Sequence, residues 1–148
     1  MDKPLVLIAD DNEATCTLVT AVLRSEFAVE VARDGHEAIE KLKSRRYAAV
    51  LLDLLMPVAD GYAVLDYLRA ERPDVLSRVM VITASVGVRQ MERIGEYPVR
   101  RVIPKPFEVD VLFNSVRECA GSAGHGFFGA PIVSSGVLLL LAEVLRRV

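Results

Sequence analysis

The stretch LLDLLMPVADG, residues 51–61, places an aspartate, Asp53, directly after an apolar run. The run begins upstream with the residues AAV at positions 48–50. Uniformly apolar runs of this length are typical of strands that are buried on both faces of a sheet. A single acid after such a strand usually starts a turn or caps the next helix. It can also lie at an edge where several parallel strands end, and the rest of the chain favours this second interpretation.

Apolar strands and amphipathic helices alternate along the first 120 residues. We expect strands at residues 5–9, 27–33, 48–52, 78–83 and 101–103. We expect helices at residues 13–25, 36–46, 61–71, 88–94 and 108–120. Asn12 is expected to cap the first of these, and Pro73 lies just beyond the end of the third. This alternation predicts an α/β fold in which helices cover both faces of a parallel sheet. Ligands of such sheets bind at the carboxyl ends of the strands.

Polar side chains follow the expected strands at that edge, namely Asp10, Asp11, Asp53, Thr83 and Lys105. Three neighbouring carboxylates repel one another unless a cation neutralises them. Oxygen ligands in an incomplete cage suit Mg²⁺, and a lysine ammonium can hold a phosphate-sized anion. The combination predicts a phosphoryl-transfer site with a carboxylate nucleophile.

Four motifs occur in a specific order: LIADDNE at 7–13, AAVLLDLLMPVADGYAVL at 48–65, VMVITA at 79–84 and IPKPF at 103–107. Together they resemble the receiver domain of two-component response regulators, over residues 1–120. The resemblance implies a flavodoxin-like, doubly wound, five-stranded parallel sheet with strand order 2-1-3-4-5.

The resemblance also implies a role for each site residue. Asp53 would accept a phosphoryl group from a sensor histidine kinase or a histidine phosphotransfer protein. Asp11 and Asp53 would bind Mg²⁺ directly, together with the backbone carbonyl of Leu55, and Asp10 would act mainly through a bound water. Lys105 and Thr83 would grip the phosphoryl oxygens. The Lys105-Pro106 peptide bond would be cis, as is common in this family, which bends the lysine toward the site. The remaining expected binding positions are Ala84, through its backbone N–H, and Leu54.

Three positions depart from the pattern of the family. Val102 stands where relatives usually carry Tyr or Phe, three residues before the lysine, so the usual aromatic switch has no ring here. We hypothesise that Tyr97, in the unusual segment GEYPVRR at 95–101, takes over part of that role, or that the output does not use this face. Leu55 is expected to give apolar cover to the site and offers no polar group to a water, which predicts slow loss of the phosphoryl group.

Composition excludes several classes of protein. The 148 residues are 52% hydrophobic, with a net charge of −2 and a pI near 5.7, which argues against nucleic-acid binding. Cys16 and Cys119 lie far apart and form neither a disulfide framework nor a zinc motif, and we expect both to be small core residues. Neither a signal peptide nor an apolar run long enough to span a membrane is present in the sequence. We therefore expect a cytoplasmic protein.

The last residues predict an appendage to the receiver domain. Residues 121–131 are rich in glycine and are typical of a linker, and residues 132–148 have the apolar spacing of a helix. Such an apolar helix has to be covered by its own receiver, a second copy, or a membrane or partner surface. We favour a homodimer or partner docking.

Three functions remain open at this point. The leading interpretation is a stand-alone, single-domain response regulator that signals by protein contact, and that is an enzyme only toward its own phosphoryl group. A scaffold or oligomerisation module with a vestigial pocket is the first alternative. A phosphatase is the second, although such enzymes usually carry an acid where Leu55 stands.

Overall fold

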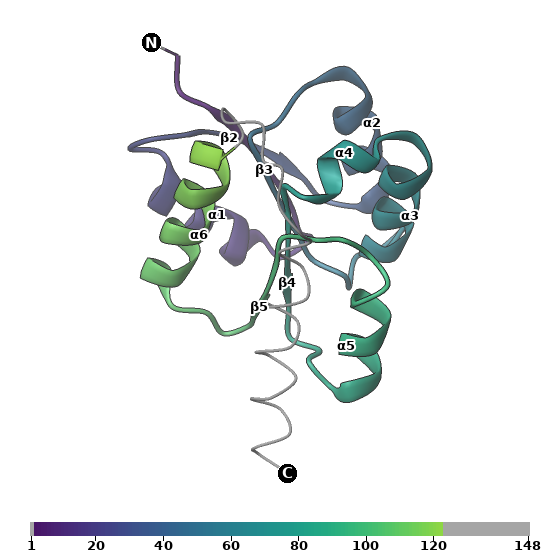
Figure 1. The fold of residues 1–148 in the computed structure, drawn as a ribbon. Helices are drawn as coiled ribbons and strands as arrows, with labels where there is room; N and C mark the ends of the chain where they lie inside the picture. Colours follow the sequence, from purple (N-terminus) through teal and green to yellow (C-terminus); the bar gives the residue numbers. More distant parts are fainter. Residues whose placement is uncertain (1, 123–148) are drawn as a thin grey trace.

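The computed structural model describes residues 2–122 and contains a five-stranded, all-parallel sheet (Figure 1). Its order is β2-β1-β3-β4-β5. The strands are β1 (Leu5–Ala9), β2 (Ala28–Ala32), β3 (Ala49–Leu52), β4 (Val79–Thr83) and β5 (Arg101–Pro104). The predicted α/β class and flavodoxin-like strand order are thereby confirmed.

Helices connect the strands and cover both faces of the sheet. They are α1 (Glu13–Leu23), α2 (Gly35–Ser44), α3 (Gly61–Glu71), α4 (Pro73–Leu76), α5 (Val88–Ile94) and α6 (Val109–Ser122). Helices α1 and α6 lie on one face, and α2, α3, α4 and α5 lie on the other (Figure 1). Each face of the sheet therefore has its own hydrophobic core.

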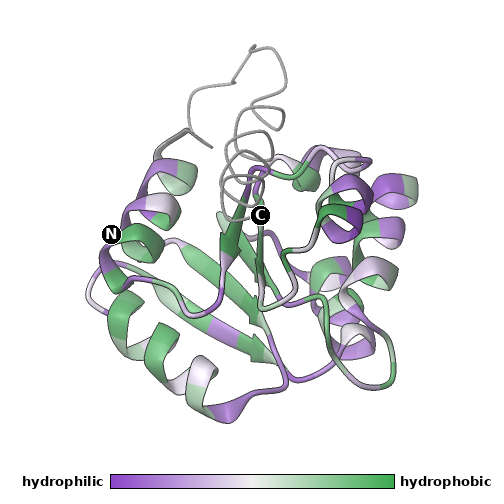
Figure 2. Cartoon of the chain, turned by 90° about the horizontal axis from the view of Figure 1, so that it is seen from below, coloured by the Kyte–Doolittle hydropathy of each residue, from purple (hydrophilic) through white to green (hydrophobic). Residues whose placement is uncertain are grey.

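The strands are mostly apolar because each contributes to both cores, and Glu30 of β2 and Arg101 of β5 are the charged exceptions. Successive side chains of a strand point to opposite faces. In β1, Val6 and Ile8 belong to the core under α1 and α6, whereas Leu7 and Ala9 belong to the opposite core. Figure 2 shows the result, because the strands are mostly hydrophobic while the helices carry both hydrophobic and hydrophilic residues. The continuous apolar runs seen in the sequence are thus the mark of a sheet buried on both sides.

Helix caps start three of the helices close to the carboxyl edge of the sheet. The side chains of Asn12, Asp34 and Asp60 accept hydrogen bonds from the backbone N–H of the third residue of α1, α2 and α3, respectively. Helix α5 follows Gly87 at its N-cap position without a side-chain cap. The strand-to-helix turns of the first three helices are therefore fixed locally, and the turn before α5 is less so.

The structure adds one element and moves several boundaries. The short helix α4 was not expected, because Pro73 was interpreted only as the end of α3, whereas proline is also well suited to the first position of a helix. Helix α6 runs to Ser122, two residues into the segment expected to be a linker. The remainder of that linker and the apolar helix expected at 132–148 lie outside the described residues. Within residues 2–122, no helix has the length and apolar character needed to cross a membrane.

Candidate functional site

The register of the sheet brings the first and third strand ends together. Ala9 of β1 is paired with Leu52 of β3, so the next residues, Asp10 and Asp53, leave the sheet side by side. The Asp53 N–H donates to the Ala9 carbonyl at 2.9 Å, which extends the ladder by one more bond. The backbone therefore fixes the separation of these two carboxylates before their side chains interact.

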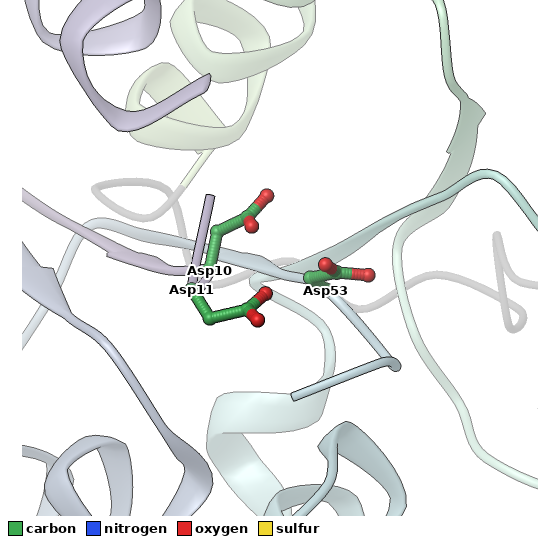
Figure 3. A group of neighbouring side chains, drawn as sticks. All are labelled: Asp10, Asp11 and Asp53. Atoms are coloured by element: carbon green, nitrogen blue, oxygen red, sulfur yellow. The ribbon is translucent and has the colours of Figure 1, made fainter. Parts of the chain in front are cut away.

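Three carboxylates meet at this edge (Figure 3). One oxygen of each of Asp10, Asp11 and Asp53 lies within 4.8 Å of the others. Asp10 and Asp53 are buried, at 1% and 6% exposure, whereas Asp11 is exposed. Such a cluster is electrostatically unfavourable without a counterion. Because all its ligands are oxygens and one side is open to water, the cluster fits a hard cation that retains several waters, as Mg²⁺ does.

Lys105 supplies a positive charge to the same cluster. Its ammonium donates to Asp10 Oδ2 at 2.7 Å and to Asp53 Oδ2 at 3.3 Å. Burial alone lowers the pKa of Lys105, but the hydrogen bond to Asp10 and the charges of Asp53 and Asp10 outweigh it and raise the pKa. Lys105 therefore stays protonated and offers a permanent cation beside the carboxylate of Asp53.

Asp53 is held in an environment that resists its ionisation. Burial raises its pKa above the usual value, and the charge of Asp10 acts in the same direction. The N–H of Leu55, which donates to Asp53 Oδ1 at 3.2 Å, and the ammonium of Lys105 act in the opposite direction without cancelling the rise. The carboxylate is thus poorly neutralised by the protein alone, which favours the binding of a further cation.

Two neighbours of Asp10 were not singled out from the sequence as parts of the site. The N–H of Asn12 donates to Asp10 Oδ1 at 2.9 Å, and the Cys16 thiol donates to the Asp10 carbonyl at 3.3 Å. Asn12 was interpreted as a helix cap, which it is, and Cys16 as a small core residue, which it also is. Only the fold shows that both also orient the loop that carries the two N-terminal acids.

Thr83 lies at the end of β4, next to the lysine-bearing segment. It is fully buried, and its Oγ1 accepts a hydrogen bond from the Ser85 N–H at 3.1 Å. The Lys105 N–H donates to the Thr83 carbonyl at 2.9 Å, so that β4 and β5 end together. The Lys105-Pro106 peptide bond is cis, as the resemblance implied. Ala84, the next residue after Thr83, is exposed.

The loop after Asp53 is packed tightly at one end and strained at another. Leu54 is buried, and its carbonyl accepts from the Gly61 N–H at 3.0 Å. A Cβ on Gly61 would lie 2.4 Å from the Asp53 carbonyl oxygen, so only glycine fits. Val58 has a φ of 68°, a left-handed conformation that β-branched residues rarely adopt. Leu55 was expected to give apolar cover, but the residue is 58% exposed.

Val102 and Tyr97, the two positions that depart from the family pattern, belong to the same core. Val102 is buried on β5, opposite Val81. Tyr97, between α5 and β5, is only 4% exposed, and its hydroxyl donates to Asp66 Oδ1 on α3 at 2.6 Å. Burial and this hydrogen bond raise the pKa of Tyr97 to about 12. The aromatic ring of this region is therefore fixed to α3.

Comparisons with known proteins agree with this geometry. The sequence model of the response regulator receiver domain matches residues 6–117. The response regulator MprA of Mycolicibacterium vanbaalenii is 32% identical over 113 residues, which are 76% of this chain and 48% of that protein. The MprA of Mycobacterium ulcerans is 32% identical over 117 residues, which are 79% of this chain and 50% of that protein. The chain thus spans about half the length of the curated relatives it matches.

Solved structures show the same arrangement of elements. The signal receiver domain of a signal transduction histidine kinase from Syntrophus aciditrophicus has a TM-score of 0.75 and 26% identity, covering 86% of this chain and 97% of that one. The receiver domain of the sensor histidine kinase PA1611 from Pseudomonas aeruginosa, solved with a magnesium ion coordinated in its active site cleft, has a TM-score of 0.73 and 27% identity. It covers 80% of this chain and 98% of that one. With a family match over residues 6–117, the chain belongs to the response regulator receiver domains.

Proposed function

We propose that this receiver domain accepts a phosphoryl group on Asp53 from a phosphohistidine, in a reaction that depends on Mg²⁺. The observation that carries the proposal is the cluster of Asp10, Asp11 and Asp53 with the Lys105 ammonium 3.3 Å from Asp53 Oδ2. An aspartate beside a fixed cation and a potential metal site suits nucleophilic attack on phosphorus. The donor would be a sensor histidine kinase or a histidine phosphotransfer protein.

In the transfer, an oxygen of the Asp53 carboxylate attacks the phosphorus of the phosphohistidine. The new bond joins that oxygen to phosphorus, the bond between phosphorus and the imidazole nitrogen breaks, and the electron pair returns to the imidazole. The products are an aspartyl phosphate and a histidine. Asp53 must be ionised to attack, so the buried and repelled carboxylate needs compensation for its raised pKa.

The residues around Asp53 have separate tasks in this scheme. Mg²⁺, when bound, would neutralise carboxylate and phosphoryl oxygens, with Asp10, Asp11, Asp53 and the carbonyl of Leu55 as its expected holders. The Lys105 ammonium is close enough to exchange its bond to Asp53 for one to a phosphoryl oxygen. The Thr83 hydroxyl and the Ala84 N–H are the further donors we propose, and Leu54 fixes the backbone next to the nucleophile.

The consequence of phosphorylation would be a change in protein contacts. The added charge on Asp53 would bias a conformational equilibrium of the domain and thereby its affinity for a partner, in the cytoplasm. A stand-alone organisation, a homodimer made through residues 132–148 and the lack of nucleic-acid binding stay predictions.

Leu55 should slow the loss of the phosphoryl group. Its exposed side chain carries no group that could orient an attacking water at Asp53. We expect Leu55→Asn to shorten the lifetime of the aspartyl phosphate, measured as the decay of the phosphorylated mass after removal of the donor. An equal lifetime in both proteins contradicts this role.

Incubation with acetyl phosphate and Mg²⁺ separates the possible functions. A single stable phosphoryl adduct in intact-mass spectra, lost in Asp53→Asn and in EDTA, supports the proposed switch. A chain that takes up no phosphoryl group would be a scaffold with a vestigial pocket. Release of many equivalents of inorganic phosphate per chain would indicate a phosphatase.

A further inference from the structure

A set of aromatic and charged side chains joins α3 to α5 on the face of the sheet opposite α1 and α6. The Tyr97 hydroxyl donates to Asp66 Oδ1 at 2.6 Å, and the Tyr62 hydroxyl donates to Gln90 Oε1. The two tyrosine rings lie 6.4 Å apart. The guanidinium groups of Arg69 and Arg93 stack on Tyr97 and Tyr62 at 4.7 and 3.6 Å. We call these residues the tyrosine clasp: Tyr62, Asp66, Arg69, Gln90, Arg93 and Tyr97.

The α3 side of the clasp is rigidly attached to the nucleophile. Tyr62 follows Gly61, whose N–H donates to the Leu54 carbonyl at 3.0 Å and which leaves no room for a Cβ beside the Asp53 carbonyl oxygen. Any displacement of the Asp53 loop must therefore move the first turn of α3. Tyr62 is in that turn, and Asp66 is in the next one.

The α5 side of the clasp is attached to the segment that follows Thr83. Helix α5 has seven residues, follows Gly87 at its N-cap position without a side-chain cap, and buries only Met91 and Ile94. An isolated helix of this length has little stability of its own. Its position therefore depends on side-chain contacts with its neighbours, and the clasp supplies contacts both from within the helix and from Tyr97 just beyond its end.

Each helix that the clasp joins follows a loop of the site. Helix α3 follows the loop that begins at Asp53, and α5 follows the segment after Thr83. In the arrangement seen here, Lys105 is bonded to Asp10 and Asp53, and Thr83 Oγ1 accepts from the Ser85 N–H. Contact of Thr83 with a phosphoryl oxygen would compete with that last bond and would move the segment leading into α5. In this structure the bonds of the tyrosine clasp are formed while Thr83 Oγ1 accepts from the Ser85 N–H.

We propose that the tyrosine clasp holds α5 against α3 while Asp53 is unphosphorylated. Phosphorylation of Asp53 shifts the domain toward an arrangement in which the clasp is loosened. This inference rests on the proposed phosphoryl acceptance by Asp53. Because coupling between two sites is reciprocal, loosening the clasp must favour the phosphorylated arrangement as much as phosphorylation loosens the clasp. The surface formed by α3 and α5 is then the part of the domain that changes for a partner.

The test compares the wild type with Tyr97→Phe, which removes one hydroxyl and keeps the buried ring. Tyr67→Phe is the matched control, because Tyr67 is also on α3 and is partly buried, and the ammonium of Lys43 on α2 lies 5.9 Å from its ring centre. Amide hydrogen exchange over residues 88–94 reports on α5. A titration with beryllium fluoride and Mg²⁺, a phosphoryl mimic, reports on the site.

We expect α5 exchange to be roughly tenfold faster in Tyr97→Phe than in the wild type or the control, as for the loss of one hydrogen bond to a charged acceptor. The apparent affinity for beryllium fluoride should rise by about twofold to tenfold. Asp66→Ala should give at least the same change, because it removes the bond to Tyr97 together with the 3.0 Å ion pair between Asp66 and Arg69. The double variant should add little to Asp66→Ala, because the Tyr97–Asp66 bond is already lost in it.

The outcomes distinguish the two levels of the proposal. If all proteins bind beryllium fluoride equally and exchange alike at α5, the coupling is overturned while phosphoryl acceptance stands. A faster α5 with unchanged affinity also overturns the coupling, since the clasp would then be only structural. Failure of the wild type to bind beryllium fluoride or to take up phosphate from acetyl phosphate overturns the proposed function and the coupling together.

Discussion

Replacing Asp53 by asparagine should stabilise the metal-free protein. At an effective dielectric constant of about 20, two unit charges 4.8 Å apart repel by about 3.5 kcal/mol. Asp53 has two such neighbours, Asp10 and Asp11, and its attraction to Lys105 at 3.3 Å contributes about 5 kcal/mol in the opposite direction. About 2 kcal/mol of net repulsion remains. The burial of Asp53 increases this penalty, and solvent screening of the exposed Asp11 decreases it.

We therefore expect Asp53→Asn to raise the free energy of unfolding by about 1–2 kcal/mol. The assay is urea unfolding at pH 7 and low ionic strength in EDTA. Lys105 stays paired with Asp10 at 2.7 Å in this variant, so no buried ammonium is left alone. Asp110→Asn, a change at an exposed acid in the first turn of α6, is the control and should stay within about 0.5 kcal/mol of the wild type.

Magnesium should then narrow or reverse the difference in the free energy of unfolding between Asp53→Asn and the wild type. A ligand at 100 times its dissociation constant stabilises the protein that binds it by about 2.7 kcal/mol, and the variant has lost one of the three carboxylates. An Asp53→Asn protein that is no more stable than the wild type in EDTA would refute the reasoning, because the cluster would then carry no electrostatic penalty for a cation to relieve.

Three further predictions follow from the same loop. The pKa of Asp53 is raised from 3.8, mainly by burial, so the folded protein binds this proton more tightly than the unfolded chain does. The ionised Asp53 carboxylate therefore destabilises the folded protein fully above its folded-state pKa. This destabilisation is lost as the pH falls through that pKa. The metal-free difference between the wild type and Asp53→Asn should accordingly shrink on acidification in urea titrations, and a growing difference contradicts this. Gly61→Ala places a Cβ 2.4 Å from the Asp53 carbonyl oxygen and should lower the free energy of unfolding in urea by more than about 2 kcal/mol. Gly87→Ala, where a Cβ would have no atom within 4 Å, is the control and should change the stability little. Equal effects of the two substitutions would show that the close contact at Gly61 does not determine stability. Val58→Asn should raise the melting temperature in calorimetry by relieving roughly 0.5–1 kcal/mol of strain at φ 68°, and a lower melting temperature would show that Val58 is not strained.

The sequence predicted the sheet well because its signal is local and redundant. Strands β1, β3 and β4 are apolar runs broken only by Thr83 at the end of β4, and burial on both faces of a sheet is a common reason for such runs. The convergence of Asp10, Asp11 and Asp53 followed from the rule that parallel strands present their carboxyl ends at one edge. No knowledge of side-chain positions was needed for this step.

The partners of the site residues could not be predicted in the same way. Lys105 was expected near Asp53, but its shorter bond is to Asp10, and that choice depends on side-chain geometry across 95 residues of sequence. Tyr97 donates a hydrogen bond to Asp66, which lies 31 residues earlier in the chain. The apolar periodicity of α3 shows which of its residues are buried, but not which of them contacts Tyr97. Helix α4 was missed because Pro73 both ends one helix and begins the next.

The most direct test of the central claim is to locate the phosphoryl group chemically. After phosphorylation by acetyl phosphate, borohydride reduces an aspartyl phosphate to homoserine, which tandem mass spectrometry assigns to one residue. The account predicts that the reduced residue is Asp53 and that EDTA abolishes the reaction. Reduction at another aspartate, or equal labelling of Asp53 with and without Mg²⁺, would contradict it.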